Sequence, residues 1–207
     1  MMQATDDLIH SLAGHAGDSG QDTASLRRFM LIALFLSFAA ATLMVWTIFG
    51  FRQDFGTMVQ GSPFLFKASG AVTLAVGAFV LARRATLPAT GPLSALLLVP
   101  GVLPFLLFAI VDPAGTDNVS AALCSVDIGL LSLPALWLIL LAMRKGAPTN
   151  PAKAGAIAGL LSGSLASAAH ALACHNDRGI SVLLWYGLAI LLLSGLGSLI
   201  GKRVLRW

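Results

Sequence analysis

Two stretches of this chain carry side chains that could bind a metal ion or change their redox state. Cys124 and Asp127 are three residues apart, and His170 and Cys174 are four residues apart. On a helix, residues at either spacing share a face. Thiolate, imidazole and carboxylate groups form the kind of ligand set that zinc or a similar thiophilic ion takes, and His175 could add a second imidazole. If the two stretches meet, these five residues predict a metal site.

The same side chains allow two other interpretations. Cys124 and Cys174 are the only cysteines in the chain, and in an oxidising compartment they could form a disulfide instead. Alternatively, the cysteines are small core residues, Asp127 hydrogen-bonds a neighbouring helix, and His170 is a satisfied core histidine. An ionisable residue at membrane depth favours function by default, which draws attention to Asp127. All three interpretations stay open at this point.

The elements that must position these residues are long apolar stretches. Hydrophobic residues make up 57% of the chain and charged residues 11%, which is not the composition of a soluble globular protein. A membrane-spanning helix needs about 20 mostly apolar residues, and an open sheet cannot satisfy its backbone in lipid. The sequence therefore predicts an all-α, polytopic membrane protein with six transmembrane helices in a bundle. The predicted spans are 29–49, 64–82, 93–111, 125–143, 154–173 and 180–200.

The positions of the thirteen Lys and Arg residues predict the orientation of the six spans. If the N-terminus lies inside, only Arg52, Lys67 and Arg178 fall on the outer side. Basic residues in short loops are retained in the cytoplasm. We therefore expect cytoplasmic N- and C-termini, with both cysteines at outer helix ends. Lys67 lies near the outer end of its span, so its side chain is expected to snorkel to the interface. The basic charge is thus a topology signal and gives no indication of a nucleic-acid partner.

The fifth predicted span has small residues at every fourth position. Such spacing gives one smooth face on which another backbone can approach closely. This face predicts the packing centre of the bundle or, alternatively, a homodimer interface. Its residues are Gly155, Gly159, Gly163, Ser167 and Ala171.

Residues 1–28 form the only sizeable water-exposed segment and are predicted to be a unit distinct from the membrane domain 29–207. Within it, residues 5–12 have the pattern of a short amphipathic helix with a capping threonine, an acidic first turn and an apolar stripe. A helix of this length is marginal alone in water, so we expect docking on a partner to stabilise it. The alternative is a disordered tail. The residues of this pattern are Thr5, Asp6, Leu8, Ile9 and Leu12.

Catalytic sequence patterns give no support to an enzyme. The chain has no phosphate-binding glycine loop, no zinc-protease motif and no nucleophile elbow. A small multi-span transporter or metal-handling membrane protein is the rival class, because prolines such as Pro104 and Pro134 interrupt predicted spans that lie near Asp127 and His170. A membrane subunit that only packs against a partner is a third class.

Four parts of the sequence together resemble a known family. They are residues 5–12, Cys124, the segment from Cys174 to Gly187, and the closing residues 201–207. Over essentially its full length the chain resembles the six-span bacterial anti-sigma factors of the NrsF type. The resemblance implies an inner-membrane protein whose N-terminal segment binds an extracytoplasmic-function sigma factor and keeps it from RNA polymerase. It also implies that Cys124 and Cys174 sense oxidative or heavy-metal stress.

Overall fold

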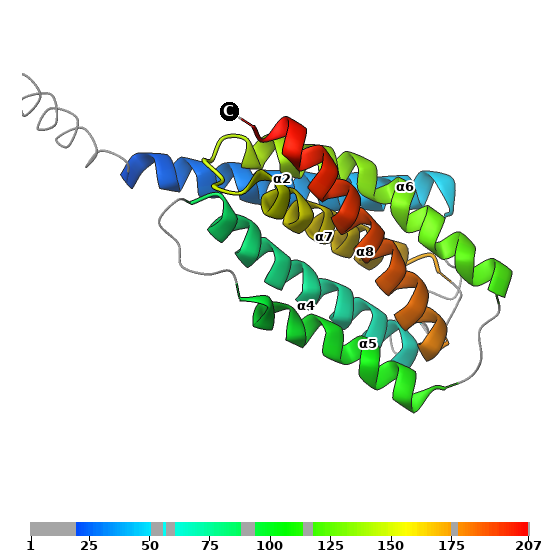
Figure 1. Cartoon of the computed structure of the whole chain (residues 1–207). Coiled ribbons are helices and arrows are strands. Elements are labelled where there is room, and N and C mark those ends of the chain that lie inside the picture. Colours follow the sequence, from blue (N-terminus) through cyan, green and yellow to red (C-terminus); the bar gives the residue numbers. More distant parts are fainter. Residues whose placement is uncertain are drawn as a thin grey trace, which may run out of the picture.

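A computed structural model describes residues 20–50, 56, 61–87, 94–113, 118–174 and 178–206 of the chain. Throughout these ranges every regular element is helical, which confirms the all-α prediction (Figure 1). The predicted helix at 5–12 lies outside the described residues. The elements are α2 (Gly20–Ile48), α4 (Ser62–Ala85), the 3-10 turn η2 (Ala95–Leu98), α5 (Val99–Val111), α6 (Asn118–Met143), α7 (Pro151–His170) and α8 (Gly179–Val204).

The helix ends follow local sequence signals. The Asn150 side chain accepts a hydrogen bond from the backbone N–H of Lys153 at 3.0 Å and so caps the start of α7. Lys202 and Arg203 lie in the last turn of α8, where positive charge complements the exposed carbonyl groups. Arg83 and Arg84 do the same in α4. These signals fix where the long helices stop.

Four of the helices are long and apolar enough to cross a membrane, and they cover Ala24–Ile48, Ser62–Ala85, Leu123–Met143 and Gly179–Val204. The predicted span 93–111 differs, because its first part is a 3-10 turn and its α-helix begins only at Val99. Ser94 accepts a hydrogen bond from the N–H of Leu96 at 3.3 Å, which favours the tight turn. Pro100 follows in the first turn of α5, where its missing N–H costs nothing.

Helix α7 lies at the centre of the bundle. Successive helices run in opposite directions along one long axis, and α7 contacts α2, α4, α6 and α8 (Figure 1). Fourteen of its twenty residues are buried. A helix enclosed in this way needs little apolar surface of its own, which explains why Ala, Gly and Ser dominate its sequence.

Glycines bring α7 and α8 into backbone contact. A Cβ atom on Gly155 would collide with the carbonyl oxygen of Gly197, and one on Gly159 with that of Leu193. A Cβ atom on Gly201 of α8 would likewise collide with the Cα atom of Gly155. The small face of α7 is therefore filled by α8 of the same chain, which leaves this face no room for a second copy.

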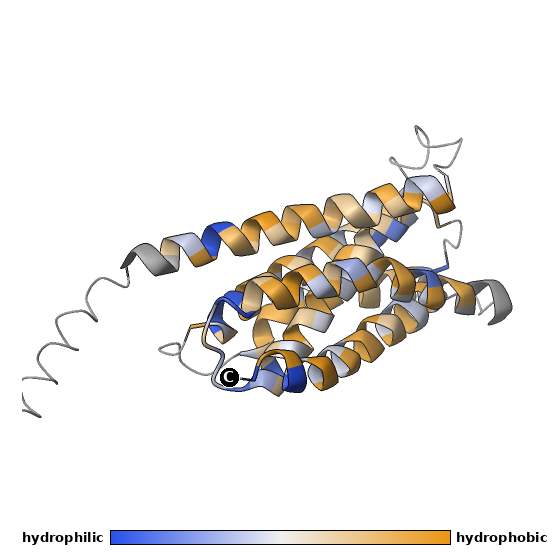
Figure 2. Cartoon of the chain, turned by 90° about the horizontal axis from the view of Figure 1, so that it is seen from above, coloured by the Kyte–Doolittle hydropathy of each residue, from blue (hydrophilic) through white to orange (hydrophobic). Residues whose placement is uncertain are grey.

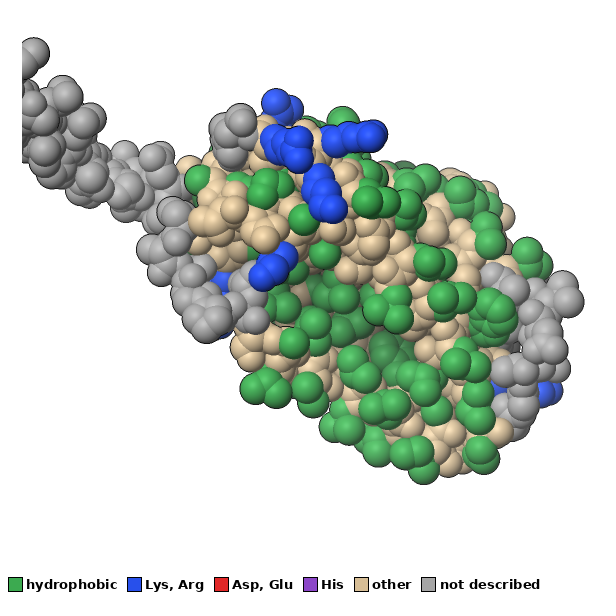
Figure 3. Space-filling view, viewed as in Figure 1, with side chains coloured by type: hydrophobic (Ala, Val, Ile, Leu, Met, Phe, Trp, Pro, Cys, Tyr) green, Lys and Arg blue, Asp and Glu red, His purple; other side chains and the backbone are tan. Residues whose placement is uncertain are grey.

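The outer surface is apolar and the interior is built from smaller residues. Large side chains such as Phe35 on α2, Ile110 on α5 and Leu191 on α8 are 68–74% exposed. Hydrophobic side chains cover the flank of the molecule in Figure 3, and hydrophilic residues gather toward the helix ends in Figure 2. The fully enclosed positions include several alanines and serines, Ser162 and Ser164 among them. This is the reverse of the distribution in a water-soluble bundle.

Candidate functional site

Three of the predicted site residues converge at one end of the bundle. Cys124 lies in the second turn of α6, and His170 is the last residue of α7. Cys174 lies in the turn that follows α7, where its backbone N–H donates to the carbonyl oxygen of His170 at 2.9 Å. This bond continues the helical pattern by one turn, which keeps Cys174 on the same side as His170. Since α6 and α7 are neighbours, the two cysteines meet across the helix pair.

The two thiols are in contact but not bonded. Their Sγ atoms are 3.4 Å apart and no disulfide joins them; a disulfide would bring them to about 2.05 Å. Cys174 is 5% exposed, whereas Cys124 is half-buried. The two Sγ atoms and a ring nitrogen of His170 all lie within 4.8 Å of one another. A single ion could therefore reach all three residues, and a small movement could join the two sulfurs.

His170 is enclosed by aromatic side chains. Its ring centroid is 5.9 Å from that of Phe49, in an edge-on arrangement, and 6.1 Å from that of Tyr186. The histidine is 3% exposed, and neither ring nitrogen makes a hydrogen bond of normal geometry within the described part of the chain. Buried polar atoms normally have such a partner. The imidazole is thus placed to act as an ion ligand or to act on the neighbouring thiols.

The surroundings of Cys174 favour its thiolate. The hydrogen bond between the Cys124 and Cys174 sulfurs lowers the pKa of Cys174 below its usual range, against the opposing effect of burial. The nearby His170 imidazole and the positive charge of Lys67 act in the same direction as Cys124. A thiolate is the reactive form of cysteine toward oxidants and metal ions.

Lys67 is buried, and the expectation that it snorkels to the interface is wrong. It lies in the second turn of α4 and is only 1% exposed. Its depth along the helix would permit snorkelling, but its side chain lies inside the bundle instead of on the lipid-facing side. From there its positive charge acts on the sulfurs of both Cys124 and Cys174. Sequence reasoning assigned Lys67 no role, and only its unusual depth in an apolar helix could have drawn attention to it.

One member of the predicted ligand set is not in this close group, and another lies outside the described residues. Asp127 shares the face of α6 with Cys124, but its carboxylate is not among the ligand atoms that lie within 4.8 Å of one another. It remains close enough for its charge to act on Cys124. His175 lies outside the described residues, as do Thr5, Asp6, Leu8, Ile9 and Leu12.

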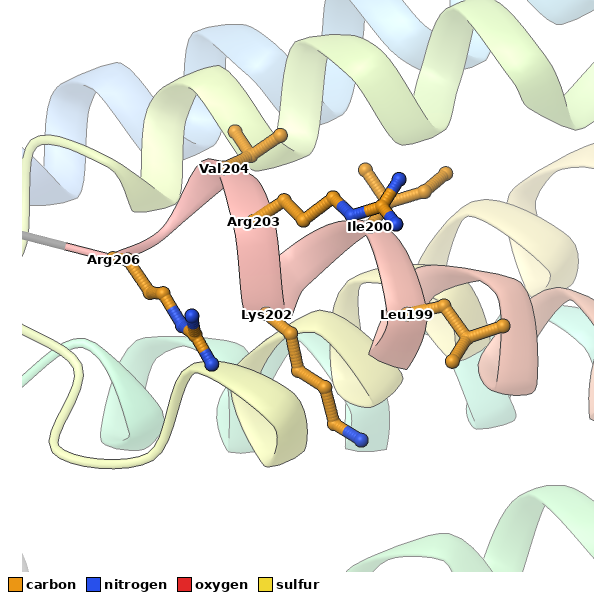
Figure 4. A pocket seen from close by; sticks show the side chains of 6 residues that line it. All are labelled: Leu199, Ile200, Lys202, Arg203, Val204 and Arg206. Carbon is orange, nitrogen blue, oxygen red and sulfur yellow. The ribbon is translucent and has the colours of Figure 1, made fainter.

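The opposite end of the bundle is basic. A groove of about 550 Å³ lies at the C-terminal end of α8, and in Figure 4 the side chains of Lys202 and Arg206 point the same way along it. Further Lys and Arg side chains gather around this end in Figure 3. Because α8 begins beside the cysteines and ends at this groove, the two features lie a full helix length apart. The groove is lined by Leu199, Ile200, Lys202, Arg203, Val204 and Arg206.

Comparison with known proteins identifies the family. The family model described as "Negative regulator of sigma F" matches residues 16–207. The chain belongs to the NrsF family. This confirms the resemblance found in the sequence, and since the family consists of regulators, it also confirms that the chain is not an enzyme. No solved structure matches the chain.

Two relatives align with the chain from end to end. The "Anti-sigma-F factor NrsF" of Caulobacter vibrioides (strain NA1000 / CB15N) is 34% identical over 214 aligned residues, which cover 98% of this chain and 99% of the relative. The "Probable anti-sigma-F factor NrsF" of Azospira oryzae (strain ATCC BAA-33 / DSM 13638 / PS) is 30% identical over 213 residues, with the same coverage. The family model begins at residue 16, so the predicted helix at 5–12 lies outside that match.

Proposed function

We propose that this chain is a multi-pass inner-membrane anti-sigma factor that holds an extracytoplasmic-function sigma factor through residues 1–28. Oxidation of Cys124 and Cys174, or binding of a thiophilic ion to them, releases the sigma factor. The observation that carries this proposal is the end-to-end similarity to two anti-sigma-F factors. The contact between the two cysteine sulfurs supplies the chemistry of the signal.

Six membrane crossings are part of the proposal. Residues 95–111, as a 3-10 turn followed by α5, extend about 28 Å from the usual rises per residue, close to the ~30 Å thickness of the hydrocarbon core. The twenty residues of α7 extend about 30 Å. Both are therefore close to the thickness of the hydrocarbon core, and large exposed apolar side chains on α2, α5 and α8 give lipid a surface to contact.

The distribution of basic residues supports the proposed orientation, with both termini in the cytoplasm. Lys202 and Arg203 end α8, Arg83 and Arg84 end α4, and Lys153 begins α7, all at one end of the bundle (Figures 1 and 3). The start of α2 and the end of α8 lie at this same end (Figure 1). Basic residues are retained in the cytoplasm. The cysteine site then faces the outer compartment, where thiols can be oxidised.

The helix contacts offer a route from the cysteines to the sigma factor. Cys124 is on α6 and His170 is on α7, and α2 packs against both helices. The first turn of α2 follows directly from residues 1–19, at the end opposite the cysteines. Near this end, the ammonium group of Lys145 lies over the ring of Phe29, 3.5 Å from the ring centroid. Lys145 belongs to the connection between α6 and α7. A change in how α6 meets α7 would therefore alter the packing of α2 and the presentation of the sigma-binding segment. A signal can shift such an equilibrium only by favouring one of the two states.

Co-purification tests the proposal. The full chain in lipid nanodiscs is mixed with candidate extracytoplasmic-function sigma factors, under reducing conditions, after treatment with oxidised glutathione, and with Zn²⁺ or Cd²⁺. We expect capture by the reduced protein, release by oxidation or metal, and no capture after removal of residues 2–19. Cys124→Ser with Cys174→Ser should capture the sigma factor under every condition. Gly195→Ala is the control that should respond as the parent does, because nothing lies within 4 Å of an added Cβ atom at that position.

Two results would contradict the proposal. One is full capture by the variant that lacks residues 2–19, and the other is unchanged release from the double serine variant. Transport of Zn²⁺ into proteoliposomes by the shortened variant would instead favour the small transporter or metal-handling protein.

A further inference from the structure

The groove at the end of α8 is a second candidate site, which the proposed function does not use. Its volume of about 550 Å³ falls within the range of about 300–1,000 Å³ that is typical of small-molecule sites. The described residues that line it are three cations and three aliphatic residues, all in the last turns of α8 or directly after them (Figure 4). A ligand that matches this lining has a negative group and an apolar part.

The cations of the groove have no acidic partner among the side chains that the structure describes. Lys202, Arg203 and Arg206 are all exposed. The described carboxylates are those of Asp112, at the end of α5 where it meets the start of α8, and Asp127, in the third turn of α6. Both lie at the cysteine end of the bundle, a full helix length away. The positive charge of the groove is therefore open to an external anion.

The lining of the groove changes from apolar to basic along α8. Leu199 comes first and is 61% exposed. Lys202 and Arg206 follow on the same face, three and seven residues later, and their side chains point the same way in Figure 4. With the end of α8 at the membrane surface, Leu199 lies about 4.5 Å deeper than Lys202. A phospholipid has the same order, with acyl chains below a phosphate, whereas a soluble anion or an acidic protein surface has no group for the deeper, apolar part.

The backbone that carries the groove is packed against α7. A Cβ atom on Gly201 would collide with the backbone of Gly155 and with the carbonyl oxygen of Pro151. Leu205 is 2% exposed, and its N–H donates to the carbonyl oxygen of Gly201 at 3.0 Å. The cations therefore extend from a backbone that is already ordered, so binding does not have to pay for ordering this end of the helix.

We propose that this groove binds one anionic phospholipid of the cytoplasmic leaflet. Lys202 and Arg206 contact the phosphate, and Arg203 adds positive charge beside it. Leu199 and Ile200 contact the acyl chains. Basic pockets on the cytoplasmic side of membrane proteins bind anionic lipid headgroups. The inference rests on the proposed function only for the membrane orientation, which puts the end of α8 in the cytoplasmic leaflet.

Basic residues at this position also have two simpler roles. They complement the exposed carbonyl groups at the end of a helix, and they retain that end in the cytoplasm. Neither role gives a preference for one lipid that depends on the groove. Arg144 and Lys153 offer the comparison, because both are exposed at the same end of the bundle and neither lines the groove. Replacing these two removes the same charges, one arginine and one lysine, from outside the groove.

Native mass spectrometry of the full chain in detergent provides the first measurement, with titration of phosphatidylglycerol or of phosphatidylcholine with the same acyl chains. We expect one phosphatidylglycerol to bind at least about tenfold more tightly than phosphatidylcholine, because each nearby cation favours the anionic headgroup. Lys202→Gln with Arg206→Gln should reduce this preference to about twofold or less, whereas Arg144→Gln with Lys153→Gln should retain it. Soluble glycerol phosphate, which has the charge without the acyl chains, should not displace the lipid at millimolar concentration.

Hydrogen exchange of the unmodified chain is the second measurement, and it does not depend on a variant that folds. Phosphatidylglycerol should slow exchange of the amides in residues 199–206 by about threefold or more relative to phosphatidylcholine, because a ligand stabilises the state that it binds.

Four results would overturn the inference. They are equal affinity for the two lipids, equal loss of preference in the two double variants, displacement by glycerol phosphate, and equal exchange of residues 199–206 in both lipids. If the groove variant kept its lipid preference but no longer captured the sigma factor, the groove would belong to a protein partner instead. The lipid measurements contain no sigma factor and no oxidant. An absent lipid preference with normal capture would therefore reject the lipid site and leave the proposed function intact, and the reverse result would do the opposite.

Discussion

Cys174 combines two properties that rarely occur together in a side chain, because it is almost fully enclosed and yet favoured as an anion. The Cys124 thiol is the largest cause, since its hydrogen bond to the Cys174 sulfur stabilises the thiolate. Burial opposes ionisation, and the effects of His170 and Lys67 help to offset it. The half-buried Cys124 is the more accessible sulfur, so the pair joins a reachable thiol to an ionised one.

The pH dependence of thiolate formation tests this arrangement. Because the pKa of Cys174 is lowered, its thiolate should persist as the pH falls well below about 8.5, the value of a free cysteine. Cys124→Ala should move the transition toward higher pH, because alanine removes the hydrogen bond that lowers the pKa of Cys174. His170→Ala should produce a smaller upward shift, because its contribution is the lesser one. Ultraviolet thiolate absorbance of the protein in nanodiscs provides the measurement, with Cys174→Ser as the blank. A transition near pH 8.5 in the parent would contradict the expectation.

At the level of whole elements, the contact between α7 and α8 depends on the absence of side chains. Gly155 and Gly159 of α7 face Gly197 and Leu193 of α8 with no space for a Cβ atom. Lipid supplies no hydrophobic drive to join helices, so close backbone packing takes its place. Adding a single methyl group to a glycine of this α7–α8 contact should therefore strongly reduce the stability of the bundle.

Two glycines of α8 form a matched pair for measuring that sensitivity. A methyl group on Gly197 would collide with the carbonyl oxygen of Gly155, whereas nothing lies within 4 Å of the corresponding position at Gly195. We expect Gly197→Ala to destabilise the protein by about 1–3 kcal/mol through overpacking. Gly195→Ala should be neutral or stabilising by about 0.5–1 kcal/mol, because alanine is the better helix former. Thermal unfolding in detergent, followed by circular dichroism, compares them. Equal effects of the two substitutions would show that the contact does not limit stability.

The sequence predicts which residues share a helix face more readily than which helix that face meets. Spacings of three and four residues grouped Cys124 with Asp127 and His170 with Cys174, and the described site contains three of the four in contact. Whether Asp127 also reaches the sulfurs depends on the rotation of α6, which periodicity does not determine. The same is true of Lys67, since its depth in α4 allows either snorkelling or burial and only its neighbours decide between them. The small face of α7 was evident from the glycine spacing, but its partner, α8, was not.

At the scale of the whole molecule, arrangements with four and with six crossings differ in the roles of α5 and α7. Helix α5 is short and begins after a 3-10 turn, and α7 is rich in small residues, so neither has the length and apolar composition of the other four. The 3-10 turn together with α5 extends about 28 Å and α7 about 30 Å, and both lengths are close to the thickness of the membrane core. The antiparallel order of the helices in Figure 1 also places both alongside the long helices over the depth of the bundle.

Reporter fusions distinguish the two topologies, because the alternatives place the same residues on opposite sides. With six crossings and cytoplasmic termini, a fusion after residue 113 lies outside and one after residue 146 lies inside. If α5 and α7 did not cross, these two positions would exchange sides, whereas fusions after residues 87 and 206 would stay inside in both cases. We therefore expect alkaline phosphatase to be active only after residue 113, and a cytoplasmic fluorescent reporter to be bright after residues 87, 146 and 206. The two unchanged positions serve as internal controls. Phosphatase activity after residue 146 would reject the six-span arrangement. The proposal that the cysteine site faces the outer compartment would then lose the argument that supports it.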